Sequence, residues 1–445
     1  MSFPARIGLI VSLLVLLAQA VGARPGDWTV ENYPYYELPP VLGIFDTVEP
    51  AGKIAWRKVE SVTPAGDLNA AAYFPDGRSI VAGENEGRDL GRIVRWDRRA
   101  GRRVWNTRPF KYARYGGYPA VRGLATNGRF VAAFPWFRAQ DKDISLAILD
   151  GRTGRVTRRL RLPSTLKGCA GRAYGRRIML QPWRMRFAGN ALYVYYKNQF
   201  GANYPGCLVV DDTWIVKWDP ARGRVLWKHR VIADGIPELG VPERACFTTP
   251  NLDVAPDGRT IASGDCNGRV LLLDARTGKK KGRVPSFLGV SRAGKMPGTY
   301  RISEIAFDPA RPGIAYCVVG DAGRKSLLAR VNLREGKFDR RLLTAQLNDI
   351  PQLRVSPDGR LLMAGYSNLF AWDLKLRAAI AIQSGYFPRF NPRVMEMMYI
   401  AGSDLEFVRL KPAEGSPRKA RAWGTSYPTM ADYGGRRGIN KDRRK

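Results

Sequence analysis

The residues that could carry acid–base chemistry in this sequence are few and scattered. There is a single histidine, His229, so a multi-histidine metal site cannot be built, and a Ser or Cys hydrolase triad would need this same residue. Carboxylates remain: Asp141 with Asp143, Asp211 with Asp212, and Asp253 with Glu304. Such pairs could act as acid and base or bind calcium, but scattered acids are usually solvated or paired with arginine. We therefore predict no catalytic residue, no metal and no cofactor, and keep carboxylate catalysis as the alternative.

Aromatic and basic residues offer a second kind of chemistry, which is binding. They gather in the long connections between β-rich segments, where aromatic planes can stack on sugars or bases and arginine forks can bind carboxylate, sulfate or phosphate. The alternative is that the aromatic side chains pin the connections down and the arginines stack on them. The ligand-binding residues that this pattern predicts are Arg114, Tyr115, Trp136, Arg138, Arg184, Tyr196, Arg301, Arg354 and Arg389.

The charge of the chain favours anionic partners. The 73 Lys and Arg residues against 39 Asp and Glu residues give a net charge of +34, and the excess is spread over the whole chain. A basic surface attracts acidic polysaccharide, nucleic acid or anionic headgroups. We expect a protein partner or such an acidic polymer, and a monomeric chain. The alternative is a generally basic proteome without a polyanionic ligand.

Repeats indicate the elements that position these residues. A Pro-Asp-Gly-Arg turn stands at 75–78, 256–259 and 357–360, with weaker copies near 127, 189, 308 and 391. Each is followed by a short β-rich run such as 79–83, 260–264 or 361–365. A strand ending in Asp and a second turn with Gly follow in most copies, as in Leu273-Asp-Ala-Arg-Thr-Gly-Lys279. Each unit is therefore four antiparallel strands, with a tight turn after the first and after the third strand and a loop between the second and third.

The two ends of the repeat array complement each other. The seventh copy stops after residues 405–410 without an outer strand, and residues 45–56 align with the segment 218–227 that is an outer strand elsewhere. An N-terminal strand near residues 52–58 would close the ring and remove a free sheet edge. The predicted fold is all-β, a seven-bladed β-propeller of four-stranded antiparallel blades over residues 45–410. The long connections then lie on one face and the tight turns on the other.

The Pro-Asp-Gly turns and Trp-Asp strand ends resemble the WD-repeat and YVTN-type propellers. The Asp-x-x-Thr-Gly-Lys and Gly-Arg-x-x-Trp pieces are similar to the quinoprotein (PQQ-like) repeat. The resemblance covers 45–410 and implies the fold, whereas these families host enzymes, scaffolds and receptors alike. A haem-attachment motif and the adjacent cysteine pair of quinoprotein dehydrogenases are missing from the sequence. The resemblance therefore favours a binding or scaffold module, with an envelope hydrolase, lyase or quinoprotein-like oxidoreductase as the alternative.

The five cysteines can be sorted by blade topology. Cys169 and Cys207 fall in the connection before blade three and in its middle loop, and Cys246 and Cys266 repeat this relation in blade four. Both connections lie on the same face, so we predict the disulfides Cys169–Cys207 and Cys246–Cys266, which an oxidising compartment permits. Cys317 lies inside a strand and is predicted to be a buried free thiol. The alternative is five reduced core cysteines.

The termini determine the expected compartment. Residues 1–23 combine a positive start, an apolar run over 7–17 and small residues, as in a secretory signal peptide. A retained membrane anchor is the alternative, but the run is shorter than a membrane span requires. We expect a secreted or periplasmic protein, with an N-terminal extension over 24–44 and a basic, disordered tail over 411–445.

Overall fold

The structure is a computed structural model. It describes residues 48–55, 71–84, 91–110, 121–135, 145–161, 178–200, 212–233, 244–245, 251–265, 268–285, 300–321, 326–345, 352–365, 368–374, 378–384, 386–401 and 404–410. Over these residues the chain is all-β, and its strands form seven four-stranded antiparallel sheets and one two-stranded sheet. The described residues include no helix that is long and apolar enough to cross a membrane.

Each of the first six sheets uses four strands that follow one another in the chain. The first three sheets contain β2 (Ala71–Tyr73), β3 (Ser79–Glu84), β4 (Arg92–Asp97) and β5 (Arg102–Thr107); β6 (Val121–Thr126), β7 (Phe130–Pro135), β8 (Ser145–Asp150) and β9 (Val156–Arg161); and β10 (Ile178–Ala188), β11 (Ala191–Phe200), β12 (Asp212–Asp219) and β13 (Arg224–Arg230). The next three contain β16 (Asp253–Val254), β17 (Thr260–Gly264), β18 (Val270–Asp274) and β19 (Lys280–Val284); β20 (Tyr300–Phe307), β21 (Ile314–Asp321), β22 (Ser326–Asn332) and β23 (Lys337–Ala345); and β24 (Gln352–Val355), β25 (Leu361–Gly365), β26 (Asn368–Asp373) and β27 (Ala378–Ser384).

The seventh sheet joins strands from both ends of the described chain. Its order is β1 (Val48–Ala55), β30 (Asp404–Leu410), β29 (Glu396–Ala401) and β28 (Tyr386–Phe390). β1 pairs antiparallel with β30 from Val48 opposite Leu410 to Ala55 opposite Asp404, with an irregularity between Pro50 and Gly52. The strand predicted near 52–58 therefore overlaps β1. A two-stranded hairpin, β14 (Ile232–Ala233) with β15 (Arg244–Ala245), was not expected from the repeats.

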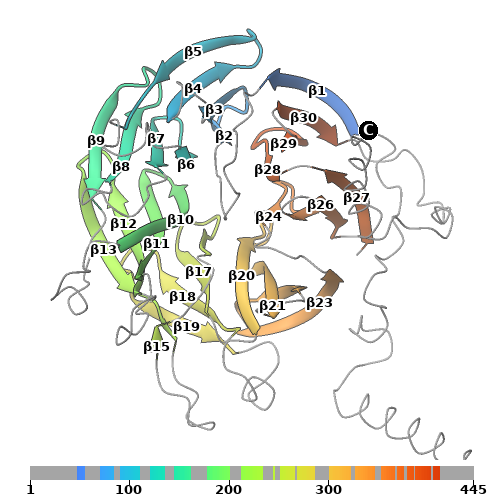
Figure 1. Ribbon diagram of the computed structural model, residues 1–445. Coiled ribbons are helices and arrows are strands. Elements are labelled where there is room, and N and C mark those ends of the chain that lie inside the picture. Colours follow the sequence, from blue (N-terminus) through green and yellow to red (C-terminus); the bar gives the residue numbers. More distant parts are fainter. Residues whose placement is uncertain are drawn as a thin grey trace, which may run out of the picture.

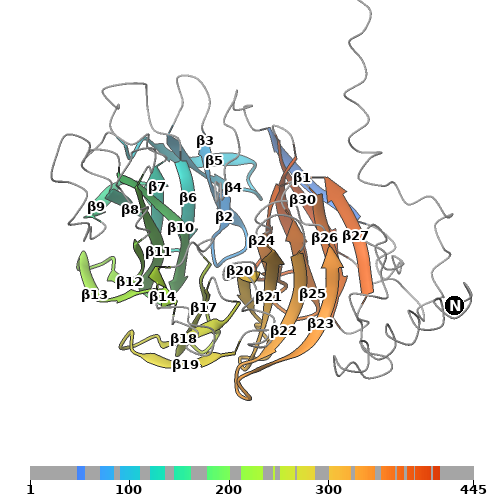
Figure 2. The same cartoon turned by 60° about the horizontal axis from the view of Figure 1, so that its bottom comes forward.

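The sheets stand around a common centre (Figure 1). β2, β6, β10, β20, β24 and β28 lie nearest the centre, and the rim is formed by β5, β9, β13, β19, β23, β27 and β1. In the turned view, inner strands such as β6, β10 and β24 run across the thickness of the ring (Figure 2). Apolar side chains fill the space between neighbouring sheets, as in the cluster of Tyr73, Met398 and Phe407 between the first and seventh sheets. Similar clusters lie between each pair of consecutive sheets from the first to the sixth.

The tight turns form where the sequence predicts them. In the first sheet the Asp76 carboxylate accepts hydrogen bonds from the backbone N–H groups of Arg78 (2.8 Å) and Ser79 (2.9 Å), and Gly77 has a φ of 67°. In the second kind of turn, Asp274 accepts from the N–H (2.7 Å) and the hydroxyl (2.8 Å) of Thr277. These hydrogen bonds hold the pKa of Asp274 below its ordinary value. Local side-chain chemistry thus explains both turn motifs.

Neighbouring sheets are linked by hydrogen bonds from a tryptophan on the outer strand of one sheet to a turn of the next sheet. Trp105 Nε1 donates to the Gly151 carbonyl at 3.0 Å, and Trp227 Nε1 donates to the Ala275 carbonyl at 3.2 Å. The Trp227 ring lies directly over Gly278, where a Cβ would be 2.6 Å from ring carbon Cδ2. Only a residue without a side chain fits beneath the ring.

Gly278→Ala is expected to lower the free energy of unfolding by about 2–4 kcal/mol. The φ of 73° costs an alanine about 1 kcal/mol, and the clash with Trp227 adds about 1–3 kcal/mol. Gly336→Ala is the matched control, because Gly336 has a φ of 65° but no atom within 4 Å of the added Cβ. Urea unfolding should show the larger loss for Gly278→Ala. Equal losses would show that the ring does not restrict this turn.

Candidate functional site

Arginines recur at one position of the inner strands. This position lies two residues before the residue that begins the tight turn of each sheet. It is occupied by Arg186, Asp253, Arg354 and Arg389. These four residues come from β10, β16, β24 and β28, which lie around the centre (Figure 1). Two residues earlier in β10 is Arg184, and β20 contributes Glu304. We call Arg184, Arg186, Arg354 and Arg389, together with Asp253 and Glu304, the axial arginine cluster.

Two ion pairs organise the cluster. Arg184 and Glu304, both almost completely buried, form an ion pair between β10 and β20. Arg186 Nε lies 3.3 Å from the Asp253 Oδ1 atom, and the other oxygen of Asp253 accepts a hydrogen bond of 2.8 Å from the backbone N–H of Phe307. Each of these carboxylates therefore fixes one guanidinium group of the cluster.

Arg354 is the residue whose environment is most unusual. Its side chain is 7% exposed, one Nη donates to the Leu353 carbonyl at 2.6 Å, and its Nε–H has no hydrogen-bond acceptor among the described residues. Burial lowers the pKa of Arg354 well below its ordinary value, and the charges of Arg389, Arg186 and Arg184 lower it further. The negative charge of Asp253 acts in the opposite direction and raises the pKa of Arg354. A buried cation beside like charges is unfavourable unless an anion offsets it.

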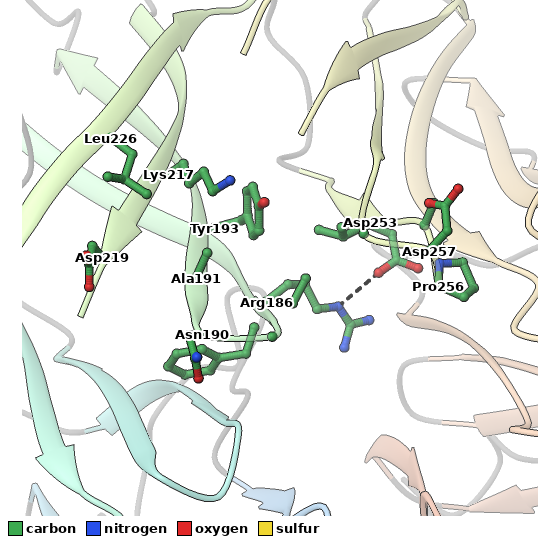
Figure 3. A pocket seen from close by; sticks show the side chains of 16 residues that line it. Arg186, Asn190, Ala191, Tyr193, Lys217, Asp219, Leu226, Asp253, Pro256 and Asp257 are labelled. Atoms are coloured by element: carbon green, nitrogen blue, oxygen red, sulfur yellow. Dashed lines mark ion pairs between the residues drawn. The ribbon is translucent and has the colours of Figure 1, made fainter. Parts of the chain in front are cut away.

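A cavity of about 720 Å³ adjoins the cluster on the side of the tight turns. Its walls include Arg186, Tyr193 and Lys217 from the third sheet and Asp253 and Asp257 from the fourth (Figure 3). Lys217 Nζ donates to the Ala275 carbonyl at 2.8 Å, and burial lowers the pKa of this amine. Burial also raises the pKa of Tyr193 to about 12. The ion pair of Arg186 and Asp253 belongs to both the cavity wall and the cluster.

Comparison with known proteins gives the family of this architecture. Residues 44–379 match the family model described as "Outer membrane protein assembly factor BamB", which has the PQQ-like repeat. The chain belongs to this family. The solved structure of the β-propeller domain of Cps50 (Swd1) from Myceliophteria thermophila is similar over 82% of this chain and 100% of that chain, with a TM-score of 0.50 and 11% identity. At this identity the likeness shows the fold alone, which is a β-propeller. No curated protein sequence matches the chain.

The propeller brings together three of the predicted binding residues. Arg184, Arg354 and Arg389 meet in the axial cluster, near the ends of inner strands. Arg301 lies on β20, and its side chain is outside the described residues, as are Arg114, Tyr115, Trp136 and Arg138. The sequence reasoning missed Arg186, although it occupies the same repeat position as Arg354 and Arg389. Aligning the blades at their tight turns would have found it.

Tyr196 is a core residue of the propeller. Its side chain is completely buried in a cluster with Phe134, Leu146 and Val194, where the second and third sheets meet. The expectation that it offers its ring to a ligand on the long-loop face is therefore corrected. The alternation along β11 directs Tyr196 into the contact between sheets.

Two of the candidate catalytic carboxylates are paired with arginines. Asp253 and Glu304 bind Arg186 and Arg184, and do not form a pair with each other. His229 lies on the outer strand β13, where burial is the largest cause that lowers its pKa. Asp141, Asp143 and Asp211 lie outside the described residues, as does the side chain of Asp212.

One cysteine prediction is confirmed. Cys317 is a free, completely buried thiol within β21, and burial raises its pKa. Its side chain packs with apolar residues between the fourth and fifth sheets. The other four cysteines, Cys169, Cys207, Cys246 and Cys266, lie outside the described residues, so their two disulfides stay a prediction.

Proposed function

We propose that this propeller is a binding or scaffold module of the cell envelope that holds an anionic group of its partner at the axial arginine cluster. The family description, an outer membrane protein assembly factor, supports an envelope location and a role in binding other proteins. The apolar N-terminal run supports export of the chain. The partner is then an acidic segment or another carboxylate- or phosphate-bearing molecule.

The observation that carries this proposal is the buried guanidinium group of Arg354. Three other arginines lie close enough to lower its pKa, while the cluster includes only the carboxylates of Asp253 and Glu304 among the described residues. Guanidinium forks match carboxylate and phosphate oxygens in two parallel hydrogen bonds. A bound anion would offset the repulsion and accept from the Arg354 Nε–H. The cluster is therefore suited to holding an anionic group.

The arrangement of the sheets explains how residues from distant parts of the sequence could form this site. We propose that the seven four-stranded sheets are the blades of one closed propeller, and that β1 closes the ring by pairing with β30. Inner-strand residues from the third to the seventh blade then converge on one axis. The aromatic and basic residues of the long-loop face, Arg114, Tyr115, Trp136, Arg138 and Arg301, are proposed to contact the remainder of the partner.

The test is calorimetric titration of the full chain with citrate and inorganic phosphate in a chloride-free buffer. We expect one site, and Arg354→Met should weaken binding at least tenfold, since a hydrogen bond to a charged group contributes about 1.5–3 kcal/mol. Arg276→Met is the matched control, because Arg276 is exposed in a turn on the rim. It should leave the affinity within twofold.

A variant that is expected to bind citrate more tightly excludes damage to the fold as the explanation for the weaker binding of Arg354→Met. Asp253→Asn removes the charge that opposes the three arginines around Arg354, while its amide oxygen can still accept from Phe307. Its affinity for citrate should rise severalfold. The proposal is wrong if the native chain binds neither anion, or if Arg354→Met and Arg276→Met behave alike.

A further inference from the structure

The outer strands of four consecutive blades are basic and contain no acidic residue. β5, β9, β13 and β19 hold two, three, three and three Lys or Arg residues, and none has an Asp or Glu. The outer strands of the other three blades are less uniform. β23 has three Lys or Arg residues together with one Asp, β27 has no charged residue, and β1 has one Glu and one Lys. Outer strands that are basic without any acidic residue therefore lie on four consecutive blades.

The contacts of these side chains leave their charges on the surface. Arg158, Arg159, Lys228 and Lys281 are exposed. Their contacts are with neutral groups: Arg158 donates to the Ala221 carbonyl at 2.9 Å, Lys281 to the Thr260 hydroxyl at 3.1 Å, and the Lys228 amine lies 5.5 Å from the centre of the Trp214 ring. Arg159 donates to the Pro109 carbonyl. In the described part of the chain, no carboxylate forms an ion pair with these four.

The acidic residues that immediately precede each outer strand in the sequence lie at one end of that strand. They belong to the turn before each outer strand, where each accepts hydrogen bonds from backbone N–H groups of that turn. These residues are Asp97, Asp150, Asp219 and Asp274. These carboxylates are therefore engaged by the backbone of their own turns, and none of them lies on an outer strand.

The four outer strands are joined into one continuous surface. Trp105 of β5 donates to the Gly151 carbonyl, Arg158 of β9 to the Ala221 carbonyl, and Trp227 of β13 to the Ala275 carbonyl. Each of these bonds connects an outer strand to the turn of the next blade. Figure 1 shows β5, β9, β13 and β19 in succession along the rim. We call this surface the basic belt.

The shape of the belt selects among anionic partners. It curves convexly over four blades of the seven. A flat bilayer would meet such a rim over one or two blades, and duplex DNA, with a persistence length of about 50 nm, resists bending around it. Single-stranded nucleic acid prefers exposed aromatic planes, whereas Trp105 is buried and the Trp227 ring covers Gly278. A flexible chain with regularly repeated negative groups can follow the belt.

We propose that the basic belt binds an acidic polysaccharide, whose carboxylate or sulfate groups contact successive outer strands. This site lies on the rim, apart from the axial arginine cluster, and does not depend on what the cluster binds. Binding would orient the propeller with its two faces free for other partners. The contribution of each Lys or Arg is electrostatic, so the affinity must fall steeply with salt.

The test compares two variants of the full chain that have the same net charge. The belt variant changes Arg158, Arg159, Lys228 and Lys281 to Gln. The control variant changes four exposed arginines of the tight turns to Gln, namely Arg152, Arg259, Arg276 and Arg334. Heparin is the sulfated probe and polygalacturonate the carboxylated one, titrated at several salt concentrations. We expect the belt variant to lose at least tenfold in affinity for both and to show a weaker salt dependence, with less than threefold loss in the control.

Other results would overturn the proposal. Equal losses in both variants would mean that net charge alone attracts the polymer. Stronger binding of the native chain to phosphatidylglycerol vesicles or to DNA than to either polysaccharide would mean that the partner class is wrong. Should the fourfold variant fail to fold by circular dichroism, Lys228→Gln with Lys281→Gln is compared with Arg276→Gln and Arg334→Gln, and a threefold difference is expected. Citrate binding at the axial cluster should be unchanged in every belt variant.

Discussion

Replacing Glu396 by Ala is expected to lower the free energy of unfolding by about 3 kcal/mol. Glu396 is buried at the start of β29 and accepts from Tyr73 Oη at 2.9 Å, from Asn391 Nδ2 at 3.2 Å, and from both terminal nitrogens of Arg98. Tyr73 and Arg98 belong to the first sheet, and Glu396 belongs to the seventh. The carboxylate thus joins the first sheet to the last.

The size of the effect follows from what the substitution leaves behind. Arg98, whose side chain is 16% exposed, would keep its charge over the Phe407 ring, 3.8 Å from the ring centre, without a carboxylate. The Tyr73 hydroxyl would lose its acceptor inside the core. Burial, followed by the negative charge of Glu396, raises the pKa of Tyr73 well above its ordinary value, so this phenol remains a hydrogen-bond donor. An uncompensated buried charge costs more than the intact pair contributes.

Urea unfolding of matched variants measures this effect. Glu335→Ala removes a carboxylate from an exposed pair, 2.7 Å from Lys337 Nζ, and should cost less than about 1 kcal/mol. Arg98→Met combined with Glu396→Leu removes both charges and should recover most of the loss seen in Glu396→Ala. A loss in Glu396→Ala no greater than that in Glu335→Ala would show that this pair does not hold the two sheets together.

The local parts of the fold could be predicted from the sequence, because their causes are local. Pro-Asp-Gly presets both the φ and the hydrogen bonds of its turn, so 260–264 and 361–365 were predicted as strands with the bounds that β17 and β25 have. The burial of Cys317 could likewise be predicted from its place inside an apolar strand. The docking of Trp227 on Gly278 was not predicted, since it depends on how one blade packs on the next.

The candidate site depends on contacts that are distant in the sequence. Arg184 and Glu304 pair across 120 positions, and Arg389 reaches Arg354 only because their strands face one axis. Repeat alignment can show that Arg186, Arg354 and Arg389 share a position, but not which neighbours have carboxylates. The sequence pattern assigns Tyr196 to a long connection, whereas β11 extends to Phe200 and directs the ring inward.

Removing β1 is expected to have the largest effect on this chain. β1 pairs with β30 over seven residue pairs from Val48 to Ala55, and no other strand covers that side of β30 in the described residues. A ladder hydrogen bond contributes about 0.5–1.5 kcal/mol, so the loss is roughly 5 kcal/mol, which is comparable to the whole stability of many domains. The strand β30 also contains Leu405 and Phe407, which are buried where the first and seventh sheets meet. Without β1, this strand would lose its hydrogen-bonded neighbour on one side.

The experiment compares chains that begin at residue 45 and at residue 56. The first should unfold cooperatively, and the second should be aggregation-prone or lose cooperative unfolding, because the bare edge of β30 can pair with other molecules. A synthetic peptide of residues 45–58 should restore cooperative unfolding to the shorter chain by strand addition, while a peptide of the same composition in scrambled order should not. Equal stability of the two chains would refute closure by β1. Rescue by both peptides would mean that any extended chain can protect β30, so the registered pairing of Ile54 with Leu405 would not be what closes the ring.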